Sequence, residues 1–340
     1  MKFKEEQTYD KLRGGYYTPK LIARFLTRWA LSSGAKSLLE PSCGDGVFLK
    51  EAVEINPLLQ TIHGAELDQK ESVIAQSKLL RNDPDSFVFS GDFFKSLSKG
   101  LFKSSYDAVV GNPPYIRYQF LDSDFQEEFK RVFHNHGLKF TKHTNAWVPF
   151  VIESVSRLEP NGRIAMIVPS ELLNVIHSGS LREFIIRSCS KILVVDPREL
   201  MFSEALQGTV LLMAIRKNVG DLSDCSLAIR YENDSNFLQN DPNSYFEQSK
   251  FIPKEISSEK WMDSLLTAEE LILLEKVKSF QHVKSFNEVA KVEVGMVTGA
   301  NAFFLVNDEV VRQFGLQQFA EPMFGKSSHS PGVIHSSENQ

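Results

Sequence analysis

Short apolar runs alternate with amphipathic stretches between about residues 36 and 216 of the chain. The runs are mostly continuous rather than alternating, as in strands buried on both faces of a sheet, and the stretches between them suit covering helices. This alternation predicts an α/β fold with a doubly wound, mostly parallel, seven-stranded sheet. The predicted strands are Ser37–Glu40, Thr61–Glu66, Ser86–Ser90, Tyr106–Gly111, Arg163–Val168, Lys191–Val195 and Thr209–Ile215, with a turn at Pro160-Asn161-Gly162 before the fifth. The predicted helices are Gly46–Glu54, Lys70–Leu79, Thr144–Leu158 and Ser180–Arg187.

The pattern changes after about Lys217. The stretch Asn233–Ser249 is rich in Asn, Asp, Ser and Gln, and this composition predicts a linker or a long loop. We therefore predict two parts of the chain, a larger domain over residues 1–230 and a smaller region over residues 231–340.

Two elements are predicted in the smaller region. Thr267–Lys278 reads as a short amphipathic helix, with Thr267 as its N-cap and Glu270 completing a capping box. Ala290–Val306 predicts a hairpin-like pair around Thr298-Gly299-Ala300-Asn301.

Composition excludes several classes of protein. The chain has 340 residues, of which 42% are hydrophobic and 24% charged, a globular balance that excludes general disorder and a collagen-like fibre. No apolar run approaches the ~20 residues of a membrane span, and the polar N-terminus lacks a signal peptide's apolar stretch. Cys43, Cys189 and Cys225 are scattered and form neither a disulfide framework nor a zinc pair. We expect a reduced, cytoplasmic protein without a membrane partner.

Charge is unevenly distributed along the chain. The net charge is −5, which alone argues weakly against a nucleic-acid partner. Residues 1–230 carry 29 Lys and Arg against 27 Asp and Glu, whereas residues 231–340 carry 9 against 16. The first two-thirds can therefore hold a basic cleft, although an ordinary solvated surface explains the numbers equally well.

The first candidate site follows three successive predicted strands. The loop Glu40–Phe48 (EPSCGDGVF) opens a helix, and its glycines allow close approach of a ligand to the backbone. Glu66 ends the next strand, where an acid can accept both hydroxyls of a ribose. Asp92 and Phe93 follow the third strand and offer an acceptor and a ring face to an adenine. These positions predict a nucleoside pocket at the carboxyl edge of the sheet.

The identity of that nucleoside is only partly decided by the loop. A dinucleotide fold can present a similar set of acids. However, Glu40 and Asp45 are poor neighbours for a pyrophosphate and good neighbours for a sulfonium and an amino group. The loop therefore favours S-adenosylmethionine.

The second candidate site is Asn112-Pro113-Pro114-Tyr115, at the end of the fourth predicted strand. Two prolines fix the backbone so that the Asn112 side chain and the Pro113 carbonyl can point at one spot. Both groups accept hydrogen bonds and suit an amino group that must become a nucleophile. Tyr115 adds a flat face for a π system.

These motifs together resemble the gamma-class DNA adenine-N6 methyltransferases of restriction–modification systems. Tyr17-Thr18-Pro19 before an amphipathic helix, the loop after Glu40 and Asn112–Tyr115 stand in the order of that class. The resemblance covers residues 12–217 well and 285–306 loosely. It implies a class I S-adenosylmethionine methyltransferase fold, with residues 1–230 as the catalytic domain and 231–340 as a linker and partial target-recognition region.

The resemblance also implies residue roles. Thr18 and Glu40 would hold the methionine end of the cofactor, Glu66 its ribose, and Asp92 and Phe93 its adenine. The implied cofactor-binding set is Tyr17, Thr18, Glu40, Ser42, Gly44, Glu66, Leu67, Asp92, Phe93 and Asn112. The implied catalytic set is Asn112 and Pro113 as acceptors of the target amino group, with Tyr115 and Phe202 as stacking aromatics.

The implied reaction is transfer of a methyl group to the N6 amino group of a flipped-out adenine, without a metal. Expected partners are double-stranded DNA and either a cognate restriction endonuclease or a separate specificity chain. Three alternatives stay open: methylation of a glutamine amide in a protein, methylation of an RNA base, and a non-catalytic DNA-binding or partner module.

Two further segments bear on DNA contact. Val294–Asn301 is similar to a motif that opens the recognition region of many large adenine methyltransferases, but its surroundings are acidic. Ile116–Lys142 is either a phosphate- and base-contacting segment or a solvated amphipathic helix with a loop. Its candidate contact residues are Arg117, Lys130, Arg131, Lys139, Lys142, Tyr118, Phe120 and Phe140.

Overall fold

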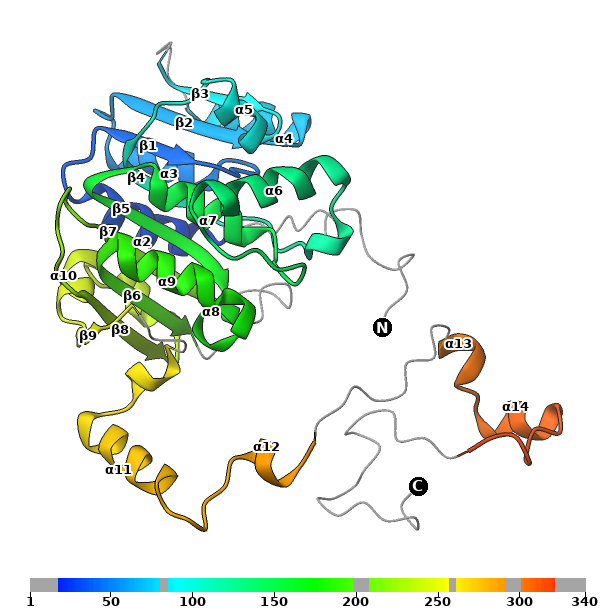
Figure 1. Ribbon diagram of the computed structural model, residues 1–340. Coiled ribbons are helices and arrows are strands. Elements are labelled where there is room, and N and C mark those ends of the chain that lie inside the picture. The colour runs from blue at the N-terminus through cyan, green and yellow to red at the C-terminus, as the bar shows by residue number, and fades with distance from the viewer. Residues whose placement is uncertain (1–17, 80–84, 198–207, 257–260, 292–300, 322–340) are drawn as a thin grey trace. The chain divides into compact units, whose positions relative to one another are not determined.

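The computed structural model describes residues 18–79, 85–197, 208–256, 261–291 and 301–321 (Figure 1). The chain divides into two compact units, one ending at Ile272 and one beginning at Leu273. The expected boundary between residues 230 and 231 falls inside a strand of the first unit, Cys225–Glu232.

One mixed sheet forms the centre of the first unit. Its described strands are β1 (Ser37–Glu40), β2 (Thr61–Glu66), β3 (Phe87–Ser90), β4 (Tyr106–Gly111), β5 (Leu158–Pro169), β6 (Cys189–Pro197), β7 (Thr209–Arg216), β8 (Cys225–Glu232) and β9 (Ile252–Lys254). They lie in the order β3-β2-β1-β4-β5-β7-β6-β8-β9. The pairs from β3 to β5 are parallel, and β7 and β9 run antiparallel to their neighbours. The order reverses between β1 and β4, which leaves a crevice at their carboxyl ends.

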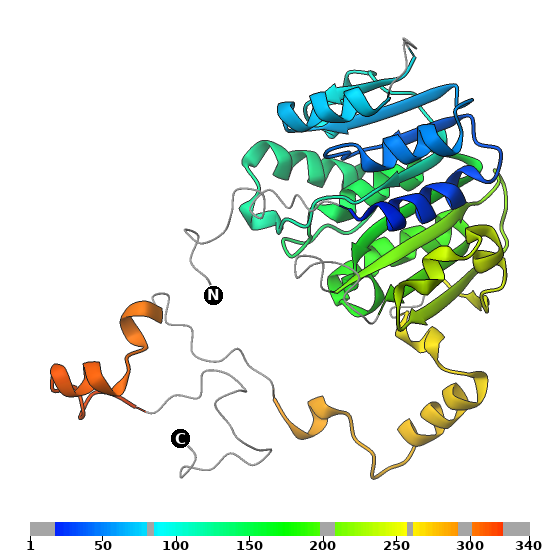
Figure 2. The same ribbon diagram turned by 180° about the vertical axis from the view of Figure 1, so that it is seen from behind.

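Helices cover both faces of this sheet. Figure 1 shows α6, α7 and α9 in front of the strands, and the reverse view in Figure 2 shows the blue helices α2, α3 and α4 on the other side. The first layer comprises α5 (Phe93–Ser98), α6 (Ser123–Asn135), α7 (Trp147–Ser156), α8 (Glu171–Asn174), α9 (Gly179–Ser188) and the 3-10 turns η2 (Tyr118–Phe120), η3 (Ile176–Ser178) and η6 (Met262–Leu265). The second comprises α2 (Lys20–Leu31), α3 (Val47–Ile55), α4 (Gln69–Leu79), η5 (Ser235–Gln239) and α10 (Pro242–Glu247).

Each face carries its own hydrophobic core. Leu39 and Val109 point into the core under α7, whereas Leu38 and Ala108 point into the core under α2. Successive strand residues alternate between faces, so a continuous apolar run is what this two-sided burial requires.

The predicted count of seven strands is wrong, because the described sheet has nine. β8 extends the sheet beyond β6 in parallel, from Lys191↔Ser226 to Pro197↔Glu232. Its half-buried C-terminal end carries the polar and charged pattern Arg-Tyr-Glu, so β8 does not stand out as an apolar run in the sequence. β9 is an edge strand of three residues that offers almost no pattern.

The predicted linker at Asn233–Ser249 is also wrong, because this stretch folds onto α2 as η5 and α10. Its few aromatic residues are buried: Phe237 and Tyr245 each lie 5.5 Å, centroid to centroid, from the ring of Phe25. Some of the polar residues that suggested a loop are helix caps, for the Asp241 carboxylate accepts from the Ser244 N–H at 2.9 Å.

A smaller difference concerns the turn predicted at Pro160–Gly162, which lies within β5. Asn161 adopts a φ of +63° and the pairing of β4 with β5 shifts register there, so the turn residues form an irregularity inside the strand.

The segment around the unit boundary is helical. α11 (Ala268–Lys278) begins where expected, since the Thr267 and Glu270 side chains and backbone N–H groups form the predicted capping box at 3.2 and 2.7 Å. The second unit contains α12 (Phe286–Val289), α13 (Asn301–Phe304) and α14 (Asp308–Gln313). The hairpin prediction is wrong for Asn301–Phe304, which is helical, and residues 292–300 lie outside the described residues. No helix in the described ranges is long and apolar enough to cross a membrane.

Candidate active site

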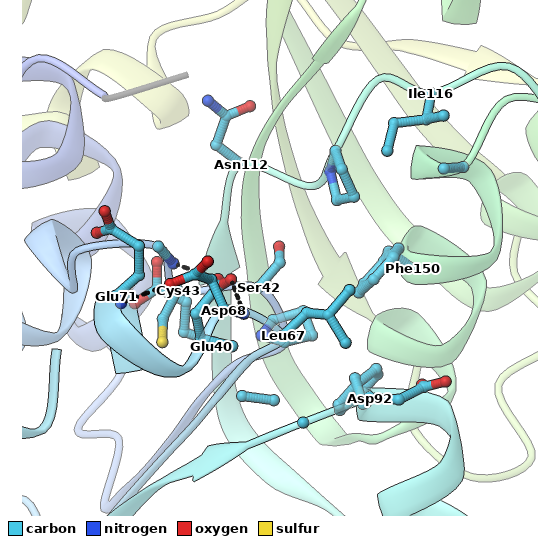
Figure 3. A pocket seen from close by; sticks show the side chains of 18 of the residues that line it. Glu40, Ser42, Cys43, Leu67, Asp68, Glu71, Asp92, Asn112, Ile116 and Phe150 are labelled. Atoms are coloured by element: carbon cyan, nitrogen blue, oxygen red, sulfur yellow. Dashed lines mark hydrogen bonds between the residues drawn. The ribbon is translucent and has the colours of Figure 1, made fainter. Parts of the chain in front are cut away.

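A cavity of about 450 Å³ opens at the carboxyl edge of β1 to β4 (Figure 3). Glu40 ends β1, Glu66 ends β2, Asp92 precedes α5 after β3, and Asn112 follows β4. All four line this cavity, so the sequence prediction that these strand ends meet is confirmed by the geometry. A volume of this size suits a nucleoside-sized ligand.

The loop after β1 is shaped by one glycine. Gly46 has a φ of +80°, and a Cβ atom there would lie 2.8 Å from the Ala75 Cα of α4. Any other residue would therefore strain the backbone and push α3 away from α4. Glycine at this position therefore lets the first turn of α3 pack closely against α4 beside the pocket.

Glu66 holds two loops together. One carboxylate oxygen accepts from the Gly44 N–H at 2.8 Å, and the other accepts from the Asp68 N–H at 2.9 Å. A carboxylate has about four lone-pair sites, so each oxygen keeps capacity for one more donor. Glu66 can thus fix the loops and bind a pair of hydroxyl groups at once.

Three buried acceptors in the pocket have no hydrogen-bond partner among the described residues. They are Glu40 Oε2, Ser42 Oγ and Asp92 Oδ2. The other Asp92 oxygen caps α5 by accepting from the Phe94 N–H at 2.8 Å and the Lys95 N–H at 3.2 Å, which fixes its free oxygen in place. A buried acceptor without a donor costs about 1–3 kcal/mol, so these atoms mark where a ligand's N–H or O–H groups fit.

The floor of the pocket is electronegative. Burial raises the pKa of Glu40, which is 1% exposed, well above its usual value, and the carboxylates of Asp45 and Glu66 raise it further. Burial also raises the pKa of Asp92. Lys78 neutralises Asp45 at 2.7 Å but leaves Glu40 without an ion-pair partner in the described structure. A cationic ligand would relieve this repulsion.

One wall of the pocket is apolar. Phe93, nearly fully buried, stacks on Phe150 of α7 with centroids 5.9 Å apart and planes 14° apart. Ile116 also lines this wall, and Phe120, which is 63% exposed, stands at its rim. Sequence reasoning missed Phe150 and Ile116 as site residues, because only their apolar character is visible in the sequence.

Asn112 is held by two neighbours. Its Nδ2 donates to Thr18 Oγ1 at 3.2 Å, and its Oδ1 accepts from the Tyr115 hydroxyl at 2.6 Å. The same hydroxyl lies 3.0 Å from the Ile167 carbonyl, which is a second acceptor for its single proton. Thr18 and Asn112 line the pocket together, as predicted, although they are far apart in the sequence.

Other predicted site residues are placed as follows. Ser42, Gly44, Leu67 and Phe93 line the pocket, with Leu67 59% exposed at its edge. Pro113 is buried beside Asn112, and Tyr115 packs between the two cores, so neither lines the cavity wall. Tyr17 and Phe202 lie outside the described residues.

The segment between β4 and α7 splits into the two kinds of structure that the sequence left open. Lys130 and Arg131 lie on the amphipathic helix α6 and pair with Glu127 and Glu128 one turn earlier. Tyr118 is buried and packs on Phe140 with ring centroids 5.0 Å apart. The remaining cations and Phe120 are exposed.

Two protein families match separate parts of the chain. The family described as Eco57I restriction-modification methylase matches residues 47–202. The family described as the C-terminal domain of the type II methyltransferase M.Eco57I matches residues 258–340.

Individual relatives agree with these matches. Type II methyltransferase M.AccI of Acinetobacter calcoaceticus is 28% identical over 320 residues, which cover 89% of this chain and 55% of the relative. Modification methylase CviBIII of Paramecium bursaria Chlorella virus NC1A is 32% identical over 178 residues, 51% of this chain and 42% of the relative. The chain thus spans about half the length of the curated relatives it matches.

A solved structure of a DrdV–DNA complex is also similar, with a TM-score of 0.56 and 16% identity over 76% of this chain and 32% of that chain. At this identity the likeness shows the fold alone. It confirms the predicted doubly wound α/β class.

Proposed function

From its similarity to restriction–modification methyltransferases over residues 47–202 and 258–340, we propose that the chain is a site-specific DNA methyltransferase acting on the N6 amino group of adenine. The observation that carries the proposal is the position of Asn112, a side-chain acceptor at the edge of a pocket whose buried acceptors lack donors. A planar amino group and a cationic nucleoside cofactor complement these two features.

S-adenosylmethionine fits the pocket by charge and by hydrogen bonding. Glu40 and Thr18 would hold its methionine end, where the ammonium and sulfonium charges offset the buried Glu40 carboxylate. Glu66 would accept from the ribose hydroxyls, and the free Asp92 oxygen from the adenine amino group. Phe93 would lie against the adenine ring beside Ile116. When bound, the cofactor supplies a methyl group activated on a sulfonium.

Asn112 and Pro113 would act on the target amino group. The nitrogen lone pair of adenine N6 is delocalised into the ring, so two acceptors are needed to bias it toward a tetrahedral geometry. Asn112 Oδ1 can accept an amino proton because the Tyr115 hydroxyl can turn to the Ile167 carbonyl. With both acceptors in place, the nitrogen would be oriented to accept the methyl group that the bound cofactor supplies, and one N–H proton would leave to solvent. Positioning and electrostatics supply most of the acceleration.

The target base must leave the duplex to reach Asn112. Unstacking costs a few kcal/mol, and stacking on an aromatic side chain offsets part of it. Tyr115 and Phe202 are our candidates for this role. Tyr115 follows Asn112 by three positions, and its hydroxyl donates to the Asn112 side chain, which keeps this aromatic residue next to the proposed acceptor.

We assign the parts of the chain and its partners on the same basis. Residues 1–230 would be the catalytic domain, and 231–340 would include the start of a target-recognition region. Double-stranded DNA is the proposed substrate, with a cognate restriction endonuclease or a specificity chain as a further partner. The match covers 55% of the length of M.AccI, so we assign only part of a target-recognition region to this chain.

Transfer of a radiolabelled methyl group tests this proposal. The protein would be incubated with labelled S-adenosylmethionine and unmethylated duplex DNA, RNA or a protein extract in parallel. We expect label in DNA alone, and the Asn112→Ala variant should lose transfer by at least about 100-fold while its cofactor affinity falls far less. Label in protein or RNA, or transfer that survives Asn112→Ala, would contradict the proposal.

A further inference from the structure

A short two-stranded contact forms beside the pocket, where the chain leaves β4 and where it returns toward α7. Arg117 and Asn145 form an antiparallel bridge. The Tyr118 N–H donates to the Thr144 carbonyl at 3.1 Å, and the Ala146 N–H donates to the Ile116 carbonyl at 2.8 Å. Backbone pairing therefore holds residues 116–118 against residues 144–146.

A third segment joins this contact from the end of β5. The rings of His143 and His177 lie 6.3 Å apart, centroid to centroid, and the Ser180 hydroxyl donates to the Lys139 carbonyl at 3.3 Å. Residues 116–118, 137–146 and 174–180 thus form one continuous surface, which we call the basic ridge.

The charge on this surface has one sign. The three segments contain Arg117, Lys139 and Lys142 but no Asp or Glu. None of these three side chains forms an ion pair within the described ranges, and all three are exposed. The acid that comes near is Glu171, whose carboxylate lies 4.0 Å from His177.

Some cations elsewhere on the same layer are neutralised. Lys95 pairs with Asp124 at 2.8 Å, and Arg187 pairs with Glu183 at 3.2 Å. The basic ridge therefore gathers three exposed cations in segments that contain no acid to compensate them. Uncompensated cations on an ordered backbone complement a polyanion.

The ridge and the pocket share one piece of backbone. Ile116 and Ala146, which are hydrogen-bonded to each other, both line the pocket. Arg117 is the next residue after Ile116, and its side chain is exposed. A nucleotide whose base enters the pocket past Ile116 would leave its phosphates at the level of Arg117.

We propose that the basic ridge binds the sugar–phosphate backbone of the DNA strand that carries the target base. This inference rests on the proposed function and names the surface that the function requires. The contacts are to phosphates, so they position the strand over the pocket without reading its sequence. Recognition of the DNA sequence then has to come from other parts of the protein. The ridge offers long, flexible cationic side chains and no helix that could enter a DNA groove.

Salt dependence gives the test a quantitative form. Each neutralised phosphate contributes about −0.9 to the slope of log affinity against log salt, so three contacts contribute about −2.7. We would measure anisotropy of a labelled 30-base-pair duplex with the full chain at several salt concentrations. The variant is Arg117→Gln/Lys139→Gln/Lys142→Gln, which removes the three charges of the ridge.

A matched control removes the same charge elsewhere. Lys36, Lys99 and Lys103 are exposed and lie before β1 and β4, at the opposite edge of the sheet. We expect the DNA affinity of the ridge variant to fall roughly tenfold to a few hundredfold at 0.1 M salt. The magnitude of its slope of log affinity against log salt should decrease by about 2 to 3. The Lys36→Gln/Lys99→Gln/Lys103→Gln control should stay within about threefold of the unchanged protein.

Cofactor binding separates this inference from the proposed function. Both triple variants should bind S-adenosylmethionine and unfold at the same temperature as the unchanged protein. Equal losses of DNA affinity in the two variants, no loss in the ridge variant, or ridge-dependent binding that prefers duplex RNA would each overturn the assignment. If cofactor binding persists in any of those cases, the ridge is wrong and the pocket assignment stands; if the unchanged protein binds neither DNA nor cofactor, both fail.

Discussion

The pocket floor and the basic ridge lie on the same edge of one sheet and carry opposite charge. The floor holds Glu40, Glu66 and Asp92, with two of the three offering unpartnered buried oxygens. The ridge holds Arg117, Lys139 and Lys142 on exposed loops without an acid in the same segments. Two residues of the ridge segments, Ile116 and Ala146, also line the pocket.

The difference shows how one edge can receive two ligands of opposite charge. Buried acceptors bind strongly and are little affected by salt, because solvent is excluded around them. Exposed cations bind through counterion release and are strongly affected by salt. A cationic cofactor bound on the pocket floor and a polyanion bound on the basic ridge would therefore meet at Asn112 without competing for a site.

Removing Glu66 should have the largest effect on the acidic side. Glu66→Ala deletes both proposed ribose contacts and leaves the Gly44 and Asp68 N–H groups without their acceptor. At about 1.5–3 kcal/mol for each hydrogen bond to a charged group, cofactor affinity should fall by at least about 100-fold. Calorimetric titration with S-adenosylmethionine measures this. A loss below about threefold would remove Glu66 from the cofactor site.

Salt should separate the two surfaces. Between 50 and 200 mM salt, three ridge contacts alone should weaken duplex binding by about 40-fold. Cofactor affinity should change by less than about twofold over the same range, because the pocket acceptors are buried. Parallel anisotropy and calorimetry measure both. If salt weakened cofactor binding and duplex binding equally, the proposed difference between the buried pocket floor and the exposed basic ridge would be wrong.

Glu40 gives the acidic side a pH dependence. Its pKa is raised by burial, so the folded, empty protein keeps this proton at pH values where the unfolded chain has lost it. The free energy of unfolding should therefore fall as pH rises from 4.5 upward, through the raised pKa. Glu40→Gln should remove this fall.

Cofactor affinity should respond in the opposite direction. The carboxylate form binds the cationic methionine end, so affinity in the unchanged protein should rise with pH while that of Glu40→Gln stays flat and roughly tenfold lower at neutral pH. Thermal unfolding and titration over a pH series measure both. A Glu40→Gln variant that parallels the unchanged protein would show that Glu40 does not titrate in this range.

Asp45 should have the smallest effect. Its pair with Lys78 is partly exposed, with side-chain exposures of 29% and 26%. Such pairs contribute about 0–1 kcal/mol, so Asp45→Asn should change the free energy of unfolding by less than about 1 kcal/mol. Cofactor affinity should fall by less than about threefold, as seen by the same titration. A larger loss would mean that Asp45 contacts the ligand directly.

The central sheet could be predicted where two-sided burial dictates the sequence. β1, β2 and β4 are buried at nearly every position, β1 and β4 carry an apolar run in the middle, and the boundaries of all three match the prediction. β8 buries its first half in the core, whereas the half-buried side chains of Arg230 and Glu232 form an ion pair at 3.1 Å in its second half, so burial dictates only part of its pattern. η5 and α10 are held by Phe237, Tyr245 and Phe246, three residues in a polar stretch.

The residues of the candidate site also divide into those that could be predicted from the sequence and those that could not. Glu40, Glu66, Asp92 and Asn112 could be predicted because parallel strands bring their carboxyl ends to one edge. Phe150 could not, since it is one of two buried aromatic residues on α7 and only packing selects the one that meets the pocket. The ridge could be predicted only in part. The sequence shows five cations between Ile116 and Lys142, but α6 pairs two of them with its own acids.

The most direct measurement is mass spectrometry of deoxynucleosides from unmethylated genomic DNA incubated with the protein and S-adenosylmethionine. The Asn112→Ala variant and a reaction without cofactor serve as controls. We predict that N6-methyldeoxyadenosine appears with the unchanged protein and in neither control. Methylation on cytosine alone, or equal N6-methyldeoxyadenosine from Asn112→Ala, would contradict the account that an adenine amino group is methylated at Asn112.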